Sequence, residues 1–349
     1  MITMACGNVR QAPRLTEDQM EITPEIQARL QKLGEKYGAI GQDMLSYLDG
    51  LLYSNSLTYW DYIHLDTLLS MQNPRTDFPD EQIFIMYHQI TELYFKLIRH
   101  ELRQLQEGWQ NGLDFWFKRI KRIVNYFKNL TQSFDVMVEG MDPEQFLKFR
   151  MSLLPASGFQ SVQYRQIELE STSVWNLMRP EARHQLDPES SIATQFPELY
   201  WKSGNLELST GKKTLTLRIF EERYDAELLD LAEQMAPLNI WALYLQLPHD
   251  DRENADLKAL LKEYDLFANV FWALSHYKSA VRYLQRDPDV IAATGGTNWQ
   301  KYLPPRFQRV VYFPALWSEE EIAEWGKAWV MELFREKVET NWGKVKRNG

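Results

Sequence analysis

The sequence contains very little cysteine and little histidine. Cys6 is the one cysteine among 349 residues, which excludes an internal disulfide, an iron–sulfur cluster, a multi-thiolate metal site and haem attachment through a Cys-x-x-Cys-His motif. A chain of this kind is typical of a reducing compartment, so we expect a cytoplasmic protein. The six histidines show no HxxH or HExxH spacing, which argues against a zinc site.

Long apolar runs and an excess of basic residues are also missing. No stretch of about 18 apolar residues appears, and the N-terminal sequence lacks the apolar core of a secretory signal. We therefore expect no membrane partner and a flexible segment over 1–22. The net charge of −9 comes from 39 Lys and Arg against 48 Asp and Glu, which argues against a nucleic-acid partner.

Helical periodicity dominates the rest of the chain. The segments with this period are 24–50, 60–72, 80–109, 112–139, 143–153, 158–178, 219–234, 256–286 and 318–343. Strand signals are limited to TLTLRIF (214–220) and RVVYFPAL (309–316). The pattern predicts an all-α fold: one helical domain over 23–349, with a loop-rich insertion or subdomain at 179–250. Its inner helices are long enough to enclose a flat cofactor.

Two histidines stand in strongly apolar helical runs. His88 lies in FIMYHQITELYF, on one helix face with Phe84 and Phe95, and His276 lies in FANVFWALSHYKSAVRYL, one turn after Trp272. A single histidine of this kind is commonly a hydrogen-bonded core residue. Two on separate helices could instead hold a haem with one histidine on each face. The residues alone leave both interpretations open.

Three other stretches could contact a ligand. Arg150 ends FLKFR one turn after Phe146, and a guanidinium beside an aromatic wall can grip a carboxylate bidentately; the alternative is a surface ion pair. The small-residue turn at 156–158 lets backbone approach a ligand closely, although the spacing alone favours an ordinary helix–helix corner. The loop ATGGTNW, which contains Thr294, could hold a carboxylate but lacks the ending of a phosphate loop.

Taken together, these pieces resemble one family. The runs LTYWDYIHLDTLLSMQ, DEQIFIMYHQITELYFKLIRHEL and FRMSLLPASGFQSVQYRQIE are similar, in order and spacing, to the haem-dependent tryptophan 2,3-dioxygenase family, and the similarity resumes at FWALSHYKSAVRYL and ATGGTNWQKYL. The resemblance implies a helical homotetramer with haem b (iron). It also implies that L-tryptophan and O2 are its substrates, the indole C2–C3 bond is cleaved, and the product is N-formyl-L-kynurenine, in the kynurenine pathway.

The resemblance also implies roles for the matching residues. His276 corresponds to the proximal haem ligand, and His88 to the distal histidine that hydrogen-bonds the indole N–H. Arg150 corresponds to the arginine that holds the substrate carboxylate, and Thr294 to the threonine that contacts the charged groups. The other expected site residues are Phe84 and Phe146 against the indole ring, Ala156, Ser157, Gly158 and Trp272 beside the haem, and Tyr59, Tyr62 and Ile63 reaching into a neighbouring subunit.

The chain departs from the family pattern in ways that leave two alternatives. The family's GTGGSSG reads ATGGTNW here, and its ELWFK reads ELYFK, with Tyr94 in place of tryptophan. The altered loop motivates a haem-dependent monooxygenase of a substituted tryptophan or another aromatic amino acid. A non-catalytic haem-binding or oxygen-sensing protein is the other alternative. The joint presence of Phe84, His88 and Arg150 speaks against it, because a sensor needs no grip on an amino acid.

Overall fold

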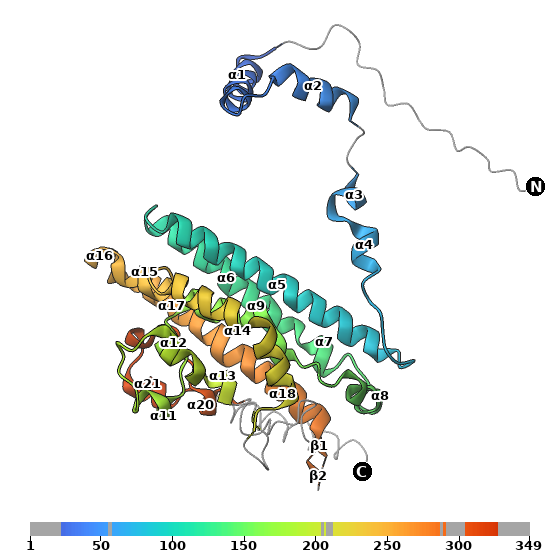
Figure 1. Ribbon diagram of the computed structural model, residues 1–349, viewed down its shortest axis with the longest axis vertical. Helices are drawn as coiled ribbons and strands as arrows, with labels where there is room; N and C mark the ends of the chain where they lie inside the picture. Colours follow the sequence, from blue (N-terminus) through green and yellow to red (C-terminus); the bar gives the residue numbers. More distant parts are fainter. Residues whose placement is uncertain are drawn as a thin grey trace, which may run out of the picture. The chain divides into compact units, whose positions relative to one another are not determined.

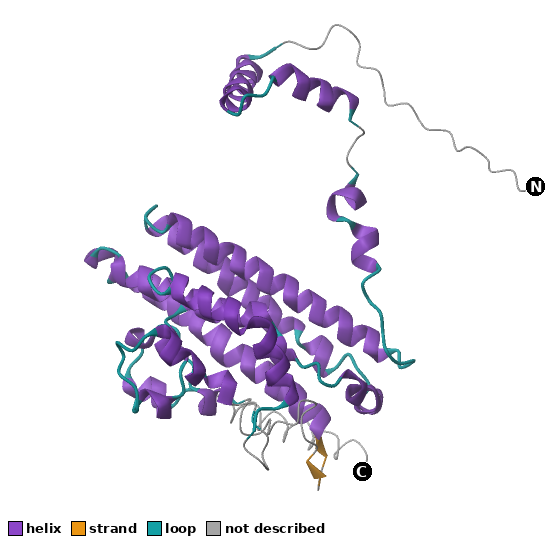
Figure 2. Cartoon of the chain, in the orientation of Figure 1, coloured by secondary structure: helices purple, strands orange, loops and turns teal. Residues whose placement is uncertain are grey.

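The computed structural model describes residues 22–54, 58–203, 206, 212–286, 289–290 and 304–326. Contacts within the chain divide it into two units, Met1–Met71 and Gln72–Gly349. Figure 2 shows that the described secondary structure is almost entirely helical, apart from the short antiparallel strands β1 (Gln285–Arg286) and β2 (Asp289–Val290). The all-α prediction is confirmed. That 23–349 folds as a single domain stays a prediction.

The first unit consists of short helices in two pairs. They are α1 (Pro24–Ala39), α2 (Met44–Tyr53), α3 (Tyr59–Ile63) and α4 (Leu65–Leu69). The predictions of one helix over 24–50 and one over 60–72 are wrong, because the backbone turns left-handed at Gly41 (φ +68°) and at His64 (φ +51°). A left-handed residue ends the run of helical hydrogen bonds.

The second unit is a helical bundle built on three long helical stretches. These are α5 (Asp80–Gly108), α6 (Leu113–Ser133) and the continuous run formed by α17 (Ala255–Leu266), η4 (Phe267–Phe271) and α18 (Trp272–Leu284). The three stretches lie side by side, and α5 and α6 are antiparallel (Figure 1). The buried residues of α6 recur three and four apart, so one face of that helix forms the core. The predicted segments at 80–109, 112–139 and 256–286 are confirmed in outline.

Shorter elements close one end of the bundle, beside the end of α18 (Figure 1). They are α7 (Asp135–Val138), α8 (Pro143–Phe149) and the 3₁₀ turn η1 (Arg150–Leu153). The carboxylate of Asp142 accepts hydrogen bonds from the backbone N–H groups of Glu144 and Gln145 and so caps α8. This cap fixes the start of the helix that carries Phe146, with Arg150 following directly.

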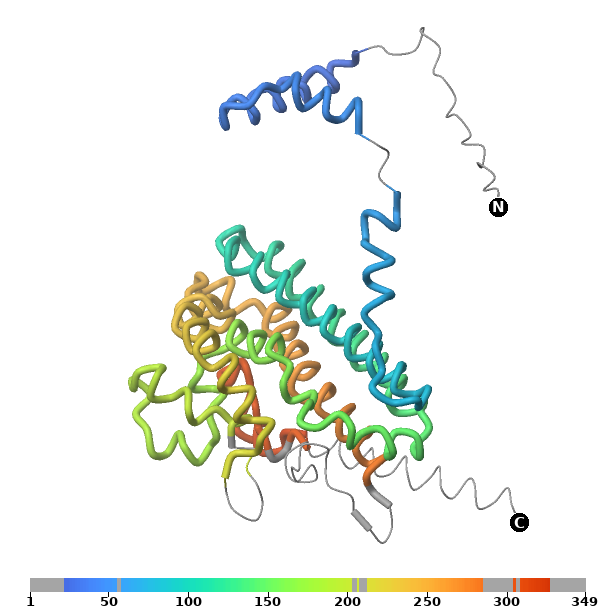
Figure 3. Tube along the Cα trace, turned by 45° about the vertical axis from the view of Figure 1, so that its right-hand side comes forward, coloured from blue at the N-terminus to red at the C-terminus, as the bar shows by residue number. Residues whose placement is uncertain are grey.

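The helix α9 (Val162–Ser171) packs against α5 and against α14 (Leu215–Met235) (Figure 3). The 3₁₀ turn η2 (Gly158–Gln160) leads into α9, and α10 (Val174–Leu177) follows it. Most side chains of α9 are buried although many are charged, since Glu168 pairs with Arg165 at 2.7 Å and Glu170 pairs with Arg99 at 2.7 Å. Pairing makes the burial of these charges tolerable.

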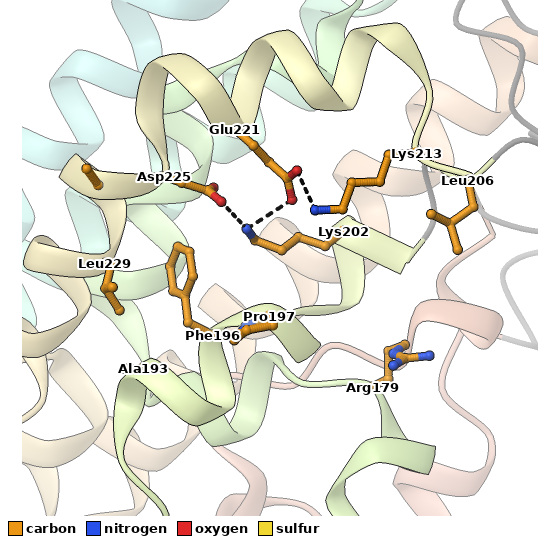
Figure 4. Close-up of a pocket in the computed structure, with 11 residues that line it drawn as sticks. Arg179, Ala193, Phe196, Pro197, Lys202, Leu206, Lys213, Glu221, Asp225 and Leu229 are labelled. Carbon is orange, nitrogen blue, oxygen red and sulfur yellow. Dashed lines mark hydrogen bonds and ion pairs between the residues drawn. The ribbon is translucent and has the colours of Figure 1, made fainter. Parts of the chain in front are cut away.

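The middle of the chain combines loops with short helices. These are α11 (Pro180–Arg183), α12 (Ile192–Gln195), η3 (Phe196–Glu198), α13 (Tyr200–Ser203), α15 (Ile240–Gln246) and α16 (His249–Arg252). The strand predicted at 214–220 is wrong, because Thr214 caps α14 and the chain is helical from Leu215. A cavity of about 480 Å³ lies here (Figure 4). On its wall Lys202 forms ion pairs with Asp225 (2.6 Å) and Glu221 (3.2 Å).

The C-terminal described stretch contains α20 (Pro305–Gln308), η5 (Pro314–Leu316) and α21 (Glu319–Ala323). The strand predicted at 309–316 is wrong, because backbone N–H groups there donate to a side chain and not to a neighbouring strand. The carboxylate of Asp265 accepts from Tyr312 (2.9 Å) and Phe313 (3.1 Å). Of the helix predicted at 318–343, residues beyond 326 lie outside the described part. Among the described helices, none is both long and apolar enough for a membrane span.

Candidate functional site

The structure brings His88 and His276 into one aromatic cluster. His88 lies on α5 and His276 on α18. Two rings connect them: Tyr87 lies edge-on to His88, Phe134 contacts Tyr87 with centroids 5.6 Å apart, and Phe134 contacts His276 at 4.6 Å. His88 also contributes to the lowered pKa of His276. Residues separated by 188 positions thus belong to the same part of the bundle.

Each imidazole is held by its own helix. Nδ1 of His88 lies 2.7 Å from the carbonyl oxygen of Phe84, and Nδ1 of His276 lies 3.1 Å from that of Trp272. A carbonyl oxygen can only accept, so Nδ1 carries the proton in both rings. In a neutral imidazole the other nitrogen, Nε2, is then unprotonated and has a lone pair available for a metal or a donor. As whole residues, both histidines are partly buried.

Burial keeps both imidazoles neutral near pH 7. It lowers the pKa of His88 below the ordinary value of 6.5, against the hydrogen bond to Phe84 and the charge of Glu92, which raise it. Burial lowers the pKa of His276 to about 4, with a further lowering from His88. The unprotonated Nε2 is therefore the dominant form of each ring at physiological pH.

Aromatic side chains from α5, α8 and α18 form a connected group that includes Phe84, the ring nearest to His88. The ring of Phe84 lies 4.1 Å from His88 and 5.8 Å from Phe149, and Phe146 lies 4.7 Å from Tyr283 on α18. These rings form one apolar, aromatic wall. A few polar atoms within an apolar, aromatic wall are the usual form of a small-molecule site.

A buried cation stands next to this wall. Arg150 follows α8 directly, one turn after Phe146, and is 7% exposed. Burial lowers the pKa of its guanidinium from the usual 12.5, yet arginine stays charged at physiological pH. The position suits recognition of a carboxylate.

Comparisons with known proteins identify relatives of this chain. A family model described as tryptophan 2,3-dioxygenase matches residues 50–173. A tryptophan 2,3-dioxygenase of a Ruegeria species is 31% identical over 277 residues, which cover 76% of this chain and 92% of the relative. The one of Bacillus thuringiensis subsp. konkukian is 30% identical over 278 residues, again 76% and 92%. The Anaeromyxobacter protein of that name is 44% identical over 121 residues, 34% of this chain and 45% of the relative.

The chain belongs to the tryptophan 2,3-dioxygenase family. The family model covers α5, α8 and α9, so His88, Phe146 and Arg150 fall within the matched stretch. This family member is an enzyme, an oxidoreductase, and the recognition made from its sequence is confirmed.

The other predicted site residues belong to other stretches of the chain. The turn of Ala156, Ser157 and Gly158 is tied to α14, where the hydroxyl of Thr216 donates to the carbonyl of Pro155 at 3.0 Å. A methyl group added at Gly158 would meet nothing within 4 Å, so the turn borders open space. In the first unit Tyr59 and Tyr62 are 69% and 71% exposed, and Ile63 is partly buried. Thr294 lies outside the described residues.

Sequence reasoning missed two aromatic residues of the cluster. Phe134 contacts Trp272 at 5.3 Å as well as His276, and Tyr283 donates its hydroxyl to the carbonyl of Met137 at 2.6 Å. Tyr283 thereby ties α18 to α7. The one available signal was that Tyr283 follows His276 by seven residues, two helical turns. Phe134 follows the last residue of the amphipathic helix α6. Its sequence position did not distinguish it from an ordinary core residue.

The residues of this dioxygenase-family site fit a haem. Among the described residues no three potential metal ligands cluster, whereas a haem iron needs only one or two axial protein ligands. His276 offers Nε2 as such a ligand, and its Nδ1 hydrogen bond is the kind of support that metal-bound histidines usually have. Both histidines retain some solvent-accessible surface as residues.

Proposed function

We propose that this family member is a haem-dependent tryptophan 2,3-dioxygenase, which cleaves the indole C2–C3 bond of L-tryptophan with O2 to give N-formyl-L-kynurenine. One observation supports the proposal most strongly. His88 and His276 belong to one aromatic cluster, and in each the Nδ1–H donates to the backbone carbonyl four residues earlier. Each presents an unprotonated Nε2, and one ring would serve as an iron ligand while the other accepts a hydrogen bond.

His276 would hold the haem through Nε2, with Trp272, Ala156, Ser157 and Gly158 as further haem contacts. When bound, the haem supplies the chemistry that activates O2. The carbonyl of Trp272 fixes the orientation and the tautomer of the His276 ring. A ring held in this way would need little reorientation to bind the iron.

His88 would position the substrate. Its Nε2 can accept only, because Nδ1 donates to Phe84, and the indole N–H of tryptophan is a donor without acceptor capacity. The pair is therefore complementary. An imidazole is far too weak a base to deprotonate indole, so His88 orients the ring and does not act as a general base. Phe84 and Phe146 would lie against the indole.

Arg150 would hold the carboxylate of the amino acid, with Thr294 contacting its charged groups. A bidentate guanidinium–carboxylate pair fixes the register of the substrate and so places the indole. The exposed fraction of Arg150 is 7%, and a contact in so dry a site is stronger than the same contact in water. A cationic grip beside an aromatic wall favours an aromatic amino acid over an indole that lacks the amino-acid group.

We also propose a cytoplasmic homotetramer in which Tyr59, Tyr62 and Ile63 complete the pocket of a neighbouring subunit. Exposed apolar side chains support an assembly. On α5 a stripe is formed by Met86, Ile90, Leu93 and Leu97, each 41–50% exposed. A spacing of four, three and four residues places these side chains on one face of the helix. Light scattering on the purified protein should give four times the chain mass of 41.3 kDa; a monomer would contradict this part of the proposal.

The reaction is tested by incubating the haem-loaded, reduced enzyme with L-tryptophan and air and identifying the product by mass spectrometry. The proposal expects N-formyl-L-kynurenine, in which both atoms of labelled O2 are incorporated. An indole-hydroxylated product with one labelled atom would instead support the monooxygenase alternative. Haem binding with no product and no spectral response to L-tryptophan would support the sensor alternative.

A further inference from the structure

The helix that carries His276 contains one wide turn. In η4 (Phe267–Phe271) the backbone follows a π-helix, and the N–H of Trp272 donates to the carbonyl of Phe267, five residues back. An α-helix would have used the carbonyl of Ala268, four residues back. A π-turn acts like a one-residue insertion and rotates the residues after it by about 100° relative to the helix before it.

The carbonyl that this turn releases is satisfied by another helix. The hydroxyl of Tyr164, on α9, donates to the carbonyl oxygen of Ala268 at 3.1 Å. Ala268 is completely buried, and a buried carbonyl without a donor costs about 1–3 kcal/mol. The hydrogen bond from Tyr164 therefore stabilises the π-turn relative to the regular helix, in which the carbonyl would be satisfied internally.

Packing holds the Tyr164 ring in place. The ring lies 5.4 Å from that of Phe95, and Phe95 lies edge-on to Trp272 at 5.8 Å. Trp272 is the residue whose carbonyl accepts from His276. The donor, the wide turn and the histidine are thus connected through contacts of neighbouring side chains.

A second side chain supports the same turn from within the helix. Asn269, in η4, donates from Nδ2 to Oδ1 of Asp265 at 2.7 Å, and both residues are buried. Asp265 in turn accepts from the backbone of Tyr312 at 2.9 Å. The carboxylate therefore joins the π-turn to the 310–317 segment, so the turn is held from two sides.

We propose that Tyr164 is a positioning residue for the family reaction: by satisfying the carbonyl of Ala268 it maintains the π-turn and thereby sets the direction in which His276 projects from α18. This inference rests on the proposed role of His276 as the haem ligand. His276 lies about two helical turns beyond Ala268. In a regular α-helix of the same sequence, His276 would project about 100° away from its present direction.

The test compares Tyr164→Phe with Tyr244→Phe, both in the full-length haem-loaded protein. Tyr164→Phe removes one hydroxyl and keeps the packed ring. Tyr244 is the control, because its ring also packs against the hydrophobic core and its hydroxyl also donates to a backbone carbonyl, that of Arg252, at 2.7 Å. The readouts are the iron–histidine stretching band of the reduced protein in resonance Raman spectra and the rate at which haem passes to apomyoglobin.

Tyr164→Phe should shift or broaden the iron–histidine band and speed haem loss about tenfold, the size expected for one hydrogen bond. Tyr244→Phe should leave both readouts as in the wild type. An unchanged band and rate in Tyr164→Phe, or equal changes in both variants, would overturn the inference. If Tyr164→Phe does not fold, Asn269→Ala is measured in its place, because it removes the other side chain that supports the π-turn. The same changes in the band and in the rate of haem loss are then expected, and their absence would overturn the inference. A wild-type protein that binds no haem would contradict the proposed function and this inference with it.

Discussion

His88 and His276 make the same hydrogen bond, from Nδ1 to the backbone carbonyl four residues earlier on the same helix, at 2.7 and 3.1 Å. The bond leaves each ring with an unprotonated Nε2. Burial then disfavours the charged imidazolium in both. The same local geometry thus serves two roles in the proposed function, iron ligation by His276 and acceptance of the indole N–H by His88.

Replacing His276 by Ala should abolish stable haem binding, because the change removes the proposed iron ligand. The measurement is the Soret absorbance per protein chain after reconstitution and desalting. His249→Ala is the control, since its side chain is 75% exposed on α16 and should bind haem as the wild type does. A normal haem spectrum in His276→Ala would show that another residue holds the iron.

The binding of L-tryptophan should depend on the protonation of His88. Because burial lowers the pKa of His88 below 6.5, Nε2 remains an acceptor at neutral pH and is lost only as the pH falls below that value. We expect the Kd for L-tryptophan to be constant between about pH 9 and 7 and to rise on acidification below about pH 6.5. A Kd that already rises between pH 9 and 7 would contradict the assigned role.

Changing Arg150 to Gln should weaken binding of L-tryptophan by about 2–5 kcal/mol, the usual cost of removing one partner from a desolvated charge pair. Arg150→Lys keeps the charge but not the bidentate geometry and should fall between the wild type and Arg150→Gln. Kd values from optical titration of the haem-loaded variants provide the measurement. Equal affinities in all three proteins would place the carboxylate elsewhere.

Asp265 organises the 310–317 segment, of which 310–313 are buried, through both of its carboxylate oxygens. Oδ2 accepts from the N–H of Phe313 and from Nε1 of Trp317, at 3.1 and 3.0 Å. In Asp265→Asn one carboxylate oxygen becomes an amide donor, so two buried donors lose their acceptor. We expect the free energy of unfolding to fall by about 2 kcal/mol or more, from a cost of about 1–3 kcal/mol per unsatisfied group. Denaturant unfolding of the apoprotein measures this.

Asp256→Asn is the matched control for that substitution. Asp256 is exposed in the first turn of α17, the same helix that carries Asp265. Its charge interacts only weakly with the helix dipole, so little change in stability is expected. If both variants unfold at the same denaturant concentration as the wild type, the carboxylate of Asp265 does not have the structural role described.

The long helices could be predicted because their apolar residues repeat with the helical period. In α6, Trp116, Ile120 and Phe127 are fully buried on one face. The two strand predictions failed for a different reason. Local alternation around Leu217 resembles a strand, but Thr214 caps a helix there, and a cap depends on one side chain, which periodicity does not register. Around Phe313 the β-branched run is held by a distant carboxylate.

The candidate site was only partly predictable for similar reasons. The pairing of Phe84 with His88 follows from a spacing of four residues on one helix. The approach of Phe134 to His276 depends on how α6 and α18 pack, and the sequence pattern contains no signal for that contact. The π-turn before Trp272 was also invisible, because it depends on a hydroxyl from α9. Residues whose role depends on tertiary packing need the structure.

The most direct test of the account is the absorption spectrum of the purified, haem-reconstituted protein during titration with L-tryptophan. The account predicts a Soret band typical of histidine-ligated haem, with about one haem per chain, and a saturable shift of that band that is weakened in Arg150→Gln. Two results would contradict the central claim, which is that His276 binds the haem and His88 binds the substrate next to it. One is a protein that takes up no haem, and the other is a Soret band that does not shift at any concentration of L-tryptophan.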